Sequence, residues 1–320
     1  MKKECFVGFD TSNYTTSVAV CDKDGKIVAN LKAPLSVASG ERGLRQSDAV
    51  FSHIKNLPGL CQGLGEMLCD YTPLGVGVST RPRSVEGSYM PCFLSGIAAA
   101  RAFAAGVNVP VEEFSHQDGH VMAALYSSGE AERLLSGEFL ALHVSGGTTE
   151  LLLAKPEGDS FSLTLIGETA DINAGQLIDR VGVMMGLDFP CGAALETLAK
   201  NGNFENQRVK SVVRERDGII SCNLSGIENI SKKLLDGGST KEEVAAYVFA
   251  SVCDTLLKMV GMAIEKHGEM PIIFSGGVMS NKLMREKLSA KFDASFAEPE
   301  FSADNAAGIA LLCRSKMMKK

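Results

Sequence analysis

The sequence predicts an α/β protein of two related domains, each with a mixed β-sheet flanked by helices. The main observation is a repeated hairpin. Cys5–Phe9 and Phe139–Val144 are apolar runs, and each is followed by a turn rich in hydroxyl groups and small residues, Ser12–Thr16 and Ser145–Thr149, and then by a second apolar run. Two unrelated hairpins would give the same pattern, but the repetition favours a duplicated fold.

Both turns, and one further segment, are typical of phosphate binding. A tight turn between strands exposes backbone N–H groups, which suit a polyphosphate held between the two halves. The further segment is an apolar strand at Pro271–Phe274, a break at Ser275–Gly277 and a helix at Asn281–Leu288. Glycine removes the Cβ that would block a ligand, and the helix N-terminus offers unpaired donors. This segment is therefore either a nucleotide shelf or an ordinary strand-to-helix loop.

Periodicity and capping residues predict the other elements. In the first half, strands are expected at Glu4–Phe9, Ser17–Cys21, Ile27–Leu31 and Gly75–Ser79, and helices at Asp48–Cys69 and Phe93–Ala105, the second ended by Gly106. In the second half, Thr240–Glu243 has the capping-box spacing of a helix that runs to His267. The last helix is expected from Asp304 to about Met318.

The restart of the pattern at the second hairpin sets the expected domain organisation. We expect an N-terminal domain at 1–125, a C-terminal domain at 126–303, and a C-terminal helix at 304–320 that packs back on the first domain. A chain of 320 residues is long enough to bury two cores of ordinary size.

Composition and charge exclude several classes of protein. With 45% hydrophobic and 22% charged residues, the chain is globular. No apolar run approaches the ~20 residues that span a bilayer, and Met1–Lys3 leads into strand sequence instead of a signal peptide, so we expect a cytoplasmic protein with no membrane partner. The nine cysteines form no CxxC pair and are expected to be free thiols. A net charge of −6 argues against a general polyanion-binding surface.

The candidate metal ligands lie in the segment Ser115–His120. His116 and His120 are four positions apart, so on a helix both imidazoles can reach one metal ion. A pair of partly exposed helix histidines is an equal alternative on spacing alone. A third ligand must come from elsewhere, and Asp304 is the natural candidate at a helix start, where a carboxylate is also a common N-cap.

Several motifs, in one order along the chain, resemble the TsaD family of tRNA adenosine threonylcarbamoyltransferases, formerly described as O-sialoglycoprotein endopeptidases. The segments that carry the resemblance are His116–His120, Val144–Thr148, Gly175–Asp179, Gly186–Gly192, Phe274–Val278 with Asn281, and Ser302–Ala307. The resemblance runs from Asp10 to the last helix. It implies the actin-like, sugar-kinase-like ATPase fold of two related domains, which agrees with the repeated hairpin.

The resemblance also implies the cofactors and the reaction. The family's metal ligands fall on His116, His120 and Asp304, which would hold one divalent ion, iron or zinc, as the catalytic centre. An adenine nucleotide, either ATP or ADP or threonylcarbamoyl-AMP, is expected on Asp10, Ser12, His143, Val144, Ser145, Gly146, Gly147, Asp179, Gly192, Gly276, Gly277 and Asn281. In the family reaction, threonylcarbamoyl-AMP donates its carbamoyl carbon to the exocyclic amine of the tRNA adenosine beside the anticodon and releases AMP. The implied partners are tRNA and an accessory protein subunit, or a second copy in a homodimer.

The chain departs from the family pattern in five places. Asp118 stands where the family has Glu in HxEGH, Thr148 replaces the His of SGGHT, and Glu228 replaces a lysine. The family's P-E-L-A-S-R segment has become Gln46–Phe51, and its G-P-G loop has become Arg81–Ser84. Nucleotide and metal positions are retained, whereas positions on the acceptor side and those that orient the donor have changed. The chain is therefore a divergent member or paralogue.

Two classes of function remain open at this point. The first is a metal-dependent carbamoyl or threonylcarbamoyl transferase, acting on tRNA adenosine or a related amine. The second is a non-catalytic nucleotide-binding scaffold that pairs with an active homologue. The three retained metal-ligand positions favour the enzyme, because a scaffold has no need of them. A metalloprotease is disfavoured since HQDGH is not HExxH, and a sugar kinase has no obvious use for paired histidines.

Overall fold

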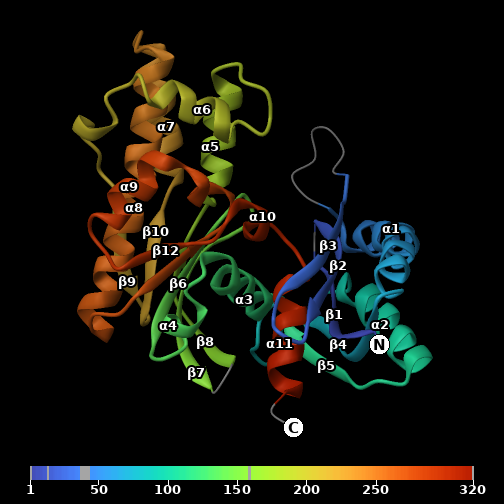
Figure 1. The fold of residues 1–320 in the computed structure, drawn as a ribbon. Helices are drawn as coiled ribbons and strands as arrows, with labels where there is room; N and C mark the ends of the chain where they lie inside the picture. The colour runs from blue at the N-terminus through green and yellow to red at the C-terminus, as the bar shows by residue number, and fades with distance from the viewer. Residues whose placement is uncertain (1, 13, 37–43, 158–159, 319–320) are drawn as a thin grey trace. The chain divides into compact units, whose positions relative to one another are not determined.

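The computed structural model describes residues 2–12, 14–36, 44–157 and 160–318, and it divides the chain into two compact units. The first unit comprises Met1–Ala131, Glu157–Phe161 and Glu300–Lys320, and the second comprises Glu132–Pro156 and Ser162–Pro299. The C-terminal segment thus belongs to the same unit as the N-terminus. Figure 1 shows the elements of both units.

The first unit is a five-stranded sheet covered on both faces by helices. Its strand order is β3-β2-β1-β4-β5, with β1 to β3 antiparallel and β1, β4 and β5 parallel. The strands are β1 (Lys3–Thr11), β2 (Thr15–Asp22), β3 (Ile27–Pro34), β4 (Tyr71–Arg81) and β5 (Val111–Ser115). The helices are α1 (Gln46–Met67), α2 (Phe93–Val107), α3 (His116–Ser128), α10 (Pro299–Ser302) and α11 (Ala307–Met317).

Alternation along β1 decides which helices cover which face. Val7 and Phe9 are buried in the core formed with α1 and α2. Gly8 points to the opposite face, where an added Cβ would lie 2.5 Å from the carbonyl oxygen of Ala306, at the start of α11. The missing side chain therefore lets α11 pack directly on the sheet, and α3 packs beside it (Figure 1).

The second unit repeats this topology. Its sheet order is β12-β11-β6-β7-β8-β10-β9, in which β6 pairs antiparallel with β7 and parallel with β11. The strands are β6 (Phe139–Val144), β7 (Thr149–Glu157), β8 (Ser160–Thr169), β9 (Val212–Arg216), β10 (Ile219–Asn223), β11 (Ile272–Ser275) and β12 (Ala294–Phe296). The run β8-β7-β6-β11-β12 has the same order as β3-β2-β1-β4-β5. The predicted duplicated α/β fold is confirmed.

The helices of the second unit build its core and the rim of its sheet. They are α5 (Ala174–Met184), α6 (Gly192–Ala199), α7 (Ser225–Asp236), α8 (Lys241–His267) and α9 (Lys282–Ser289), with short 3₁₀ turns η1 (Phe204–Asn206) and η2 (Gly277–Ser280); α4 (Ala131–Leu134) spans the boundary between the units. The predicted capping box of α8 is present, because Thr240 and Glu243 exchange hydrogen bonds.

Helix α8 is central to this core. By length and composition it is apolar enough to cross a membrane, but 67% of its apolar stretch is buried inside the protein. Asp254 and Lys258 interrupt the apolar sequence of the helix and form an ion pair at 2.9 Å. Its apolar face is therefore explained by packing against the sheet of the second unit.

Several predicted helix ends are wrong. Helix α1 is Gln46–Met67, two residues earlier at each end than the predicted Asp48–Cys69. Helix α2 continues past Gly106 to Val107, and Asn108 ends it in the left-handed conformation at φ 54°. The last helix begins at Ala307 instead of Asp304, because Oδ1 of Asn305 accepts the N–H of Ala307. Asp304 is consequently in a turn before the helix and is not its N-cap. All nine cysteines are free thiols, as predicted.

Asp171 joins the end of β8 to the start of α7. Its carboxylate accepts the backbone N–H groups of Leu224 at 2.9 Å and Ser225 at 3.1 Å, and the Ser225 hydroxyl at 2.6 Å. Partial burial raises the pKa of Asp171, but these hydrogen bonds outweigh it and lower the pKa to about 2. The carboxylate is thus more stable charged in the folded protein than in the unfolded chain.

We expect Asp171→Asn to destabilise the second unit by about 1 kcal/mol at neutral pH. This value is smaller than that of a buried hydrogen bond to a charged group, because the Asp171 side chain is exposed. The lowered pKa means that the unfolded state binds more protons between about pH 4 and pH 2, so the contribution is lost as the pH falls through this range. Urea unfolding of the variant, with the exposed Asp236→Asn as control, should show a difference at pH 6 that shrinks toward pH 2.5. A pH-independent difference would contradict this account.

Candidate functional site

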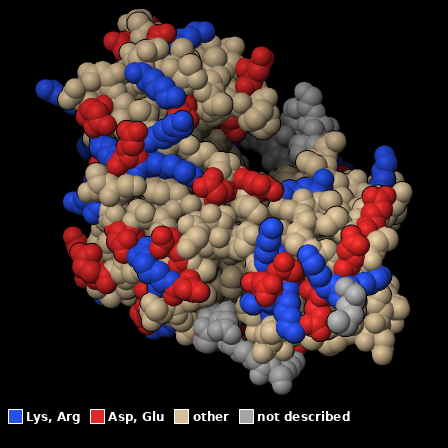
Figure 2. Space-filling view, viewed as in Figure 1, with Lys and Arg blue, Asp and Glu red and all other residues tan. Residues whose placement is uncertain are grey.

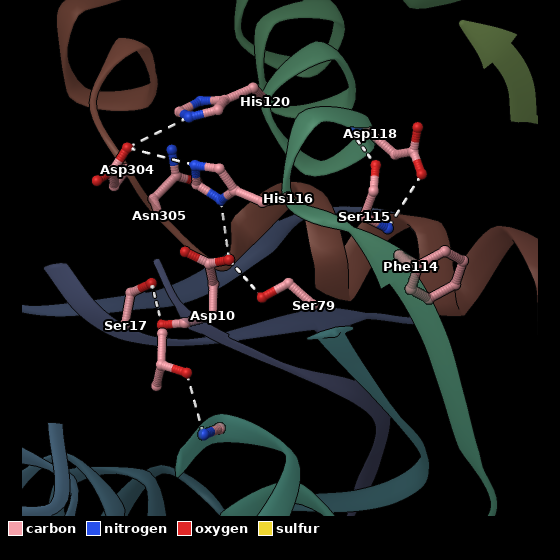
Figure 3. Close-up of polar contacts among 12 residues, drawn as sticks. Asp10, Ser17, Ser79, Phe114, Ser115, His116, Asp118, His120, Asp304 and Asn305 are labelled. Atoms are coloured by element: carbon pink, nitrogen blue, oxygen red, sulfur yellow. Dashed lines mark hydrogen bonds and ion pairs between the residues drawn. The ribbon is translucent and has the colours of Figure 1, made fainter. Parts of the chain in front are cut away.

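A cluster of two histidines and one aspartate lies in the first unit (Figure 3). Oδ1 of Asp304 is 3.2 Å from Nε2 of His120 and 3.6 Å from Nε2 of His116, and all three ligand atoms lie within 4.8 Å of one another. The side chains are 14% exposed at His120, 19% at His116 and 23% at Asp304, so the cluster is largely buried but still in contact with solvent. The imidazole rings are 4.3 Å apart at their centroids.

The start of helix α3 positions both histidines. Ser115 is its N-cap and accepts the N–H of Asp118, while the Asp118 carboxylate accepts the N–H of Ser115 at 3.1 Å. This capping box makes His116 the first residue of the helix and places His120 one turn later. Oδ2 of Asp118 also accepts the hydroxyl of Ser84 at 2.8 Å. The aspartate in HQDGH is therefore used to fix the helix start.

Close packing of α3 against α11 brings Asp304 to the histidines. A Cβ added to Gly308 would lie 1.9 Å from the carbonyl oxygen of Gly119, and one added to Gly119 would lie 2.8 Å from Ile309. The contact at Gly308 is with backbone and requires glycine, whereas the contact at Gly119 is with the end of the flexible Ile309 side chain. Since Gly119 lies between the two histidines, the close contact of Gly308 with its backbone places the start of α11, and the turn of Asp304 before it, beside them.

Asp10, near the end of β1, supports the ring of His116. Its Oδ1 is 2.9 Å from Nδ1 of His116 and accepts the hydroxyl of Ser79 at 2.5 Å. Burial raises the pKa of Asp10, but the charge and hydrogen bond of His116 outweigh it and lower the pKa. Burial lowers the pKa of His116, because it disfavours the charged imidazolium. The charges and hydrogen bonds of Asp10 and Asp304 outweigh this effect and raise the pKa to about 10. With Nδ1 held by Asp10, Nε2 is the atom presented to Asp304.

These residues fit a divalent transition metal. Two imidazole nitrogens and one carboxylate oxygen are a common ligand set for iron or zinc that leaves further positions open. A carboxylate on the far nitrogen of a ligating histidine, as Asp10 provides, is the usual outer support of such a ligand. Because the proton on His116 is strongly held, an ion bound through Nε2 would have to displace a proton.

A separate cavity of about 360 Å³ lies within the second unit. It is bordered by the N-terminal turns of three helices, α5, α6 and α9, whose dipoles favour an anion. Among the first N–H groups of α5 and α9, that of Gly175 is already bonded to the Ser145 carbonyl and that of Lys282 to Glu196, both at 3.1 Å. Its lining includes Gly146, Gly175, Asp179, Gly192, Glu196, Gly277 and Asn281. Asn281 caps α9 by accepting the N–H of Met284. The cavity is large enough for a nucleotide-sized ligand.

The structure distributes the expected nucleotide residues over three places. Gly146, Asp179, Gly192, Gly277 and Asn281 line the cavity of the second unit. His143, Val144, Ser145, Gly147 and Gly276 belong to the strand ends and turns beside it. Asp10 and Ser12 are buried in the first unit, where Asp10 contacts His116.

Gly276 allows the two turns of the second unit, those after β6 and β11, to approach each other closely. Its φ is 95°, and a Cβ there would lie 2.2 Å from the carbonyl oxygen of Val144. The ring of His143 is 3.0 Å from the Ser275 hydroxyl, which joins the same strands. These residues therefore shape the turns that border the cavity.

The turn after β6 is less open than the sequence predicted. The Ser145 hydroxyl accepts the N–H groups of Gly147 at 3.3 Å and Thr148 at 3.1 Å. The side chain of a serine at the start of a turn can accept these N–H groups, which are then not available to a ligand. The expectation that several N–H groups of this turn are exposed is therefore wrong for these two, although Gly146 lines the cavity. Asn13, in the other predicted turn, lies outside the described residues.

Two polar residues near these sites were not predicted. Glu196 lines the cavity and accepts the N–H of Lys282, at the start of α9. His53 is fully buried in the first unit, with Nδ1 2.9 Å from the Thr16 hydroxyl, and burial lowers its pKa. The small number of histidines, five in the chain, was the only sequence signal for His53.

Solved structures define the class of protein to which this fold belongs. Full-length HypF in its phosphate- and nucleotide-bound form superposes with a TM-score of 0.61 at 15% identity, over 100% of this chain and 56% of that one. A ROK family glucokinase from Streptomyces griseus, in complex with glucose and AMPPNP, gives 0.52 at 12% identity, over 97% and 99%. The chain has the actin-like, sugar-kinase-like ATPase fold.

Sequence comparison identifies the family within this class. The model of the family TsaD, tRNA N6-adenosine threonylcarbamoyltransferase, matches residues 87–311. Proteins of that name from Streptococcus pneumoniae strain JJA and Streptococcus suis strain 05ZYH33 are 30% and 29% identical, each over 100% of this chain and 94% of the relative. The chain therefore belongs to the TsaD family, as a divergent member, and its named relatives are transferases.

The departures from the family pattern have structural explanations in part. Glu228 pairs with Arg180 at 3.2 Å on the surface of the second unit. Arg81 ends β4 beside Ser115, and the carbonyl of Pro82 accepts the N–H of Gln117. The changed loop is thus attached to the start of α3, next to the histidines. Nothing in the structure explains the exposed Phe51, 70% accessible on α1.

Proposed function

We propose that this chain is a metal-dependent transferase that moves a threonylcarbamoyl group from threonylcarbamoyl-AMP to a tRNA adenosine next to the anticodon, or a paralogue that uses a related carbamoyl donor or acceptor. One observation carries the proposal. His116, His120 and Asp304 converge on one point with Asp10 behind them, in a member of a transferase family. A nucleotide-binding scaffold has no need for this convergence.

His116, His120 and Asp304 are proposed to hold one divalent ion, iron or zinc. When bound, the ion would act as a Lewis acid toward the carbonyl oxygen of the transferred group. Asp10 fixes the ring of His116 so that Nε2 faces the ion, and the buried Ser79 hydroxyl holds Asp10 in turn. The protein thereby supplies a preorganised ligand set, so that little rearrangement is needed when the substrate arrives.

The cavity of the second unit is proposed to bind the adenine nucleotide, as ATP, ADP or the AMP part of the donor. Gly146 and Gly277 leave room for phosphate, and the N-termini of α5, α6 and α9 favour its negative charge. Asp179 and Glu196 suit the ribose hydroxyls, because a carboxylate accepts hydrogen bonds from both. Burial raises the pKa of Asp179, and the hydrogen bond from the N–H of Cys191 opposes this shift only in part.

A tRNA substrate requires a partner. On the face shown in Figure 2, Lys and Arg side chains are interspersed with Asp and Glu instead of forming one basic field, and the net charge is −6. Binding through about six phosphate contacts would be steeply salt-dependent. We propose a cytoplasmic protein that binds an accessory subunit, or a second copy, at the exposed apolar residues of the first unit. These include Phe51 and Ile54 on α1 and Leu94 on α2.

The proposal predicts that the lone chain does not modify tRNA. Purified protein, threonylcarbamoyl-AMP and tRNA should be mixed at low salt, with and without candidate partners, and modified adenosine measured by mass spectrometry. We expect product only with a partner, and loss of product in Asp304→Asn but not in the exposed control Asp293→Asn. Efficient turnover by the lone chain would contradict the partner requirement. No turnover with any partner would favour the scaffold function or another acceptor.

A further inference from the structure

Lys32 lies on the same sheet face as the metal-ligand cluster. In the antiparallel pairs β1–β2 and β2–β3, Asp10 is opposite Ser17 and Ser17 is opposite Lys32. Residues opposite one another project from the same face of a sheet, so the three side chains form one row across the strands. This is the face on which α11 packs, with the turn of Asp304 before it.

The contacts of Lys32 direct its ammonium group toward that turn. Its Nζ donates to the carbonyl oxygen of Glu300 at 2.5 Å, at the start of the segment that leads to Asp304. Burial lowers the pKa of Lys32, and the charges of Glu300 and Asp304 oppose this shift only in part. An ammonium group has three N–H donors, and the described structure assigns one of them.

Buried polar groups without partners occur in the same part of the first unit. Within the described part of the chain, Oδ2 of Asp10, the Ser12 hydroxyl, and both amide atoms of Asn30 lack a hydrogen bond. Asp10 and Ser12 are 0% and 2% exposed. Asn30 is two residues from Lys32 on β3 and therefore on the same face. Buried polar atoms without partners are costly, which suits a site completed by a polar ligand.

The charge of the cluster indicates which ligand it takes. Asp10 and Asp304 contribute two negative charges, a divalent ion two positive charges, and Lys32 one more. With neutral histidines as ligands, these groups give the loaded site a net charge of about +1. The carboxylate of Glu300 also acts on Lys32, but Glu300 is exposed to solvent, so its charge is screened and a buried compensating anion is still favoured. A threonylcarbamoyl group has one carboxylate, which would neutralise the site.

We propose that Lys32 binds the carboxylate of the transferred acyl group and so selects an amino-acid-derived carbamoyl donor. This inference rests on the proposed function. Lys32 is a specificity-determining residue that acts on the ligand and not on the ion. The alternative is that Lys32 only fastens the Glu300 turn to the sheet, and the two roles give different results in binding experiments.

The test is a cycle of two ligands and two proteins. N-carbamoyl-L-threonine and its C-terminal amide, which lacks the negative charge, are titrated by calorimetry into the wild-type chain and into Lys32→Met. We expect the wild type to prefer the acid at least tenfold and the variant to lose that preference. Lys32→Arg should retain it, and the exposed control Lys26→Met should match the wild type. Metal content is measured on every sample.

Each result decides one of the two proposals. An unchanged preference for the acid in Lys32→Met would overturn the role of Lys32, whatever the metal content. Equal, low metal in every sample with a lost preference in Lys32→Met would overturn the metal proposal and support Lys32. A lower melting temperature in Lys32→Met with the preference retained would support the fastening role and overturn ours.

Discussion

Replacing His116 with alanine is expected to weaken binding of the divalent ion by at least about 100-fold, because loss of a direct ligand should exceed the 10–100-fold cost of losing an outer support. The remaining pair, His120 and Asp304, would hold an open-site ion poorly. Elemental analysis of protein purified without chelator should therefore give about one iron or zinc per wild-type chain and little in the variant.

Two further variants separate ligand loss from a general disturbance of the unit. His267→Ala, at the end of α8 in the second unit, removes an imidazole without touching the cluster and should leave the metal content unchanged. Asp10→Asn keeps all three ligands but removes the charge behind His116, so its affinity should fall by about 10–100-fold. If wild type and His116→Ala hold equally little iron and zinc, the histidine pair is structural and the transferase proposal loses its main support.

The fold could be predicted from the sequence because its main signals are local. Each half begins with an apolar run, a short turn and a second apolar run, and these became β1–β2 and β6–β7 with the same position in two sheets of the same order. The capping box at Thr240 and the predicted end at His267, where Gly268 follows, are local signals too, and α8 has both ends as predicted. The start of α11 was less predictable, because it depends on the Asn305 side chain, which accepts the N–H of Ala307.

The site was predictable only as far as its residues are neighbours in the chain. The spacing of His116 and His120 is enough to place two imidazoles together on one helix. Asp304 could be named as a candidate third ligand from the sequence and from the family resemblance, but its approach depends on the close contact of Gly308 with the backbone of Gly119, which no spacing reveals. Lys32 depends on strand register, so it became visible only with the structure.

The largest expected effect in the second unit is the loss of nucleotide binding in Gly146→Val. Gly146 lines the cavity, its φ is not in the left-handed region, and a Cβ built there meets no atom within 4 Å. The valine side chain should therefore fit the free protein and occupy the space that a phosphate would need. We expect binding of ADP to weaken by at least about 100-fold, which corresponds to about 2.7 kcal/mol, with a melting temperature close to that of the wild type.

Two other glycines make this prediction specific to the cavity. Gly226, exposed at the start of α7, also has open space around its Cβ, so Gly226→Val should change neither binding nor stability. Gly175 is the opposite case, because its Cβ would lie 2.6 Å from the backbone nitrogen of Gly146, and Gly175→Val should lower stability together with binding. Calorimetry with ATP, ADP and AMP separates these outcomes. If the wild type binds none of the three at millimolar concentration, the cavity is not a nucleotide site. Its glycines and helix N-termini would then serve only the packing of the second unit.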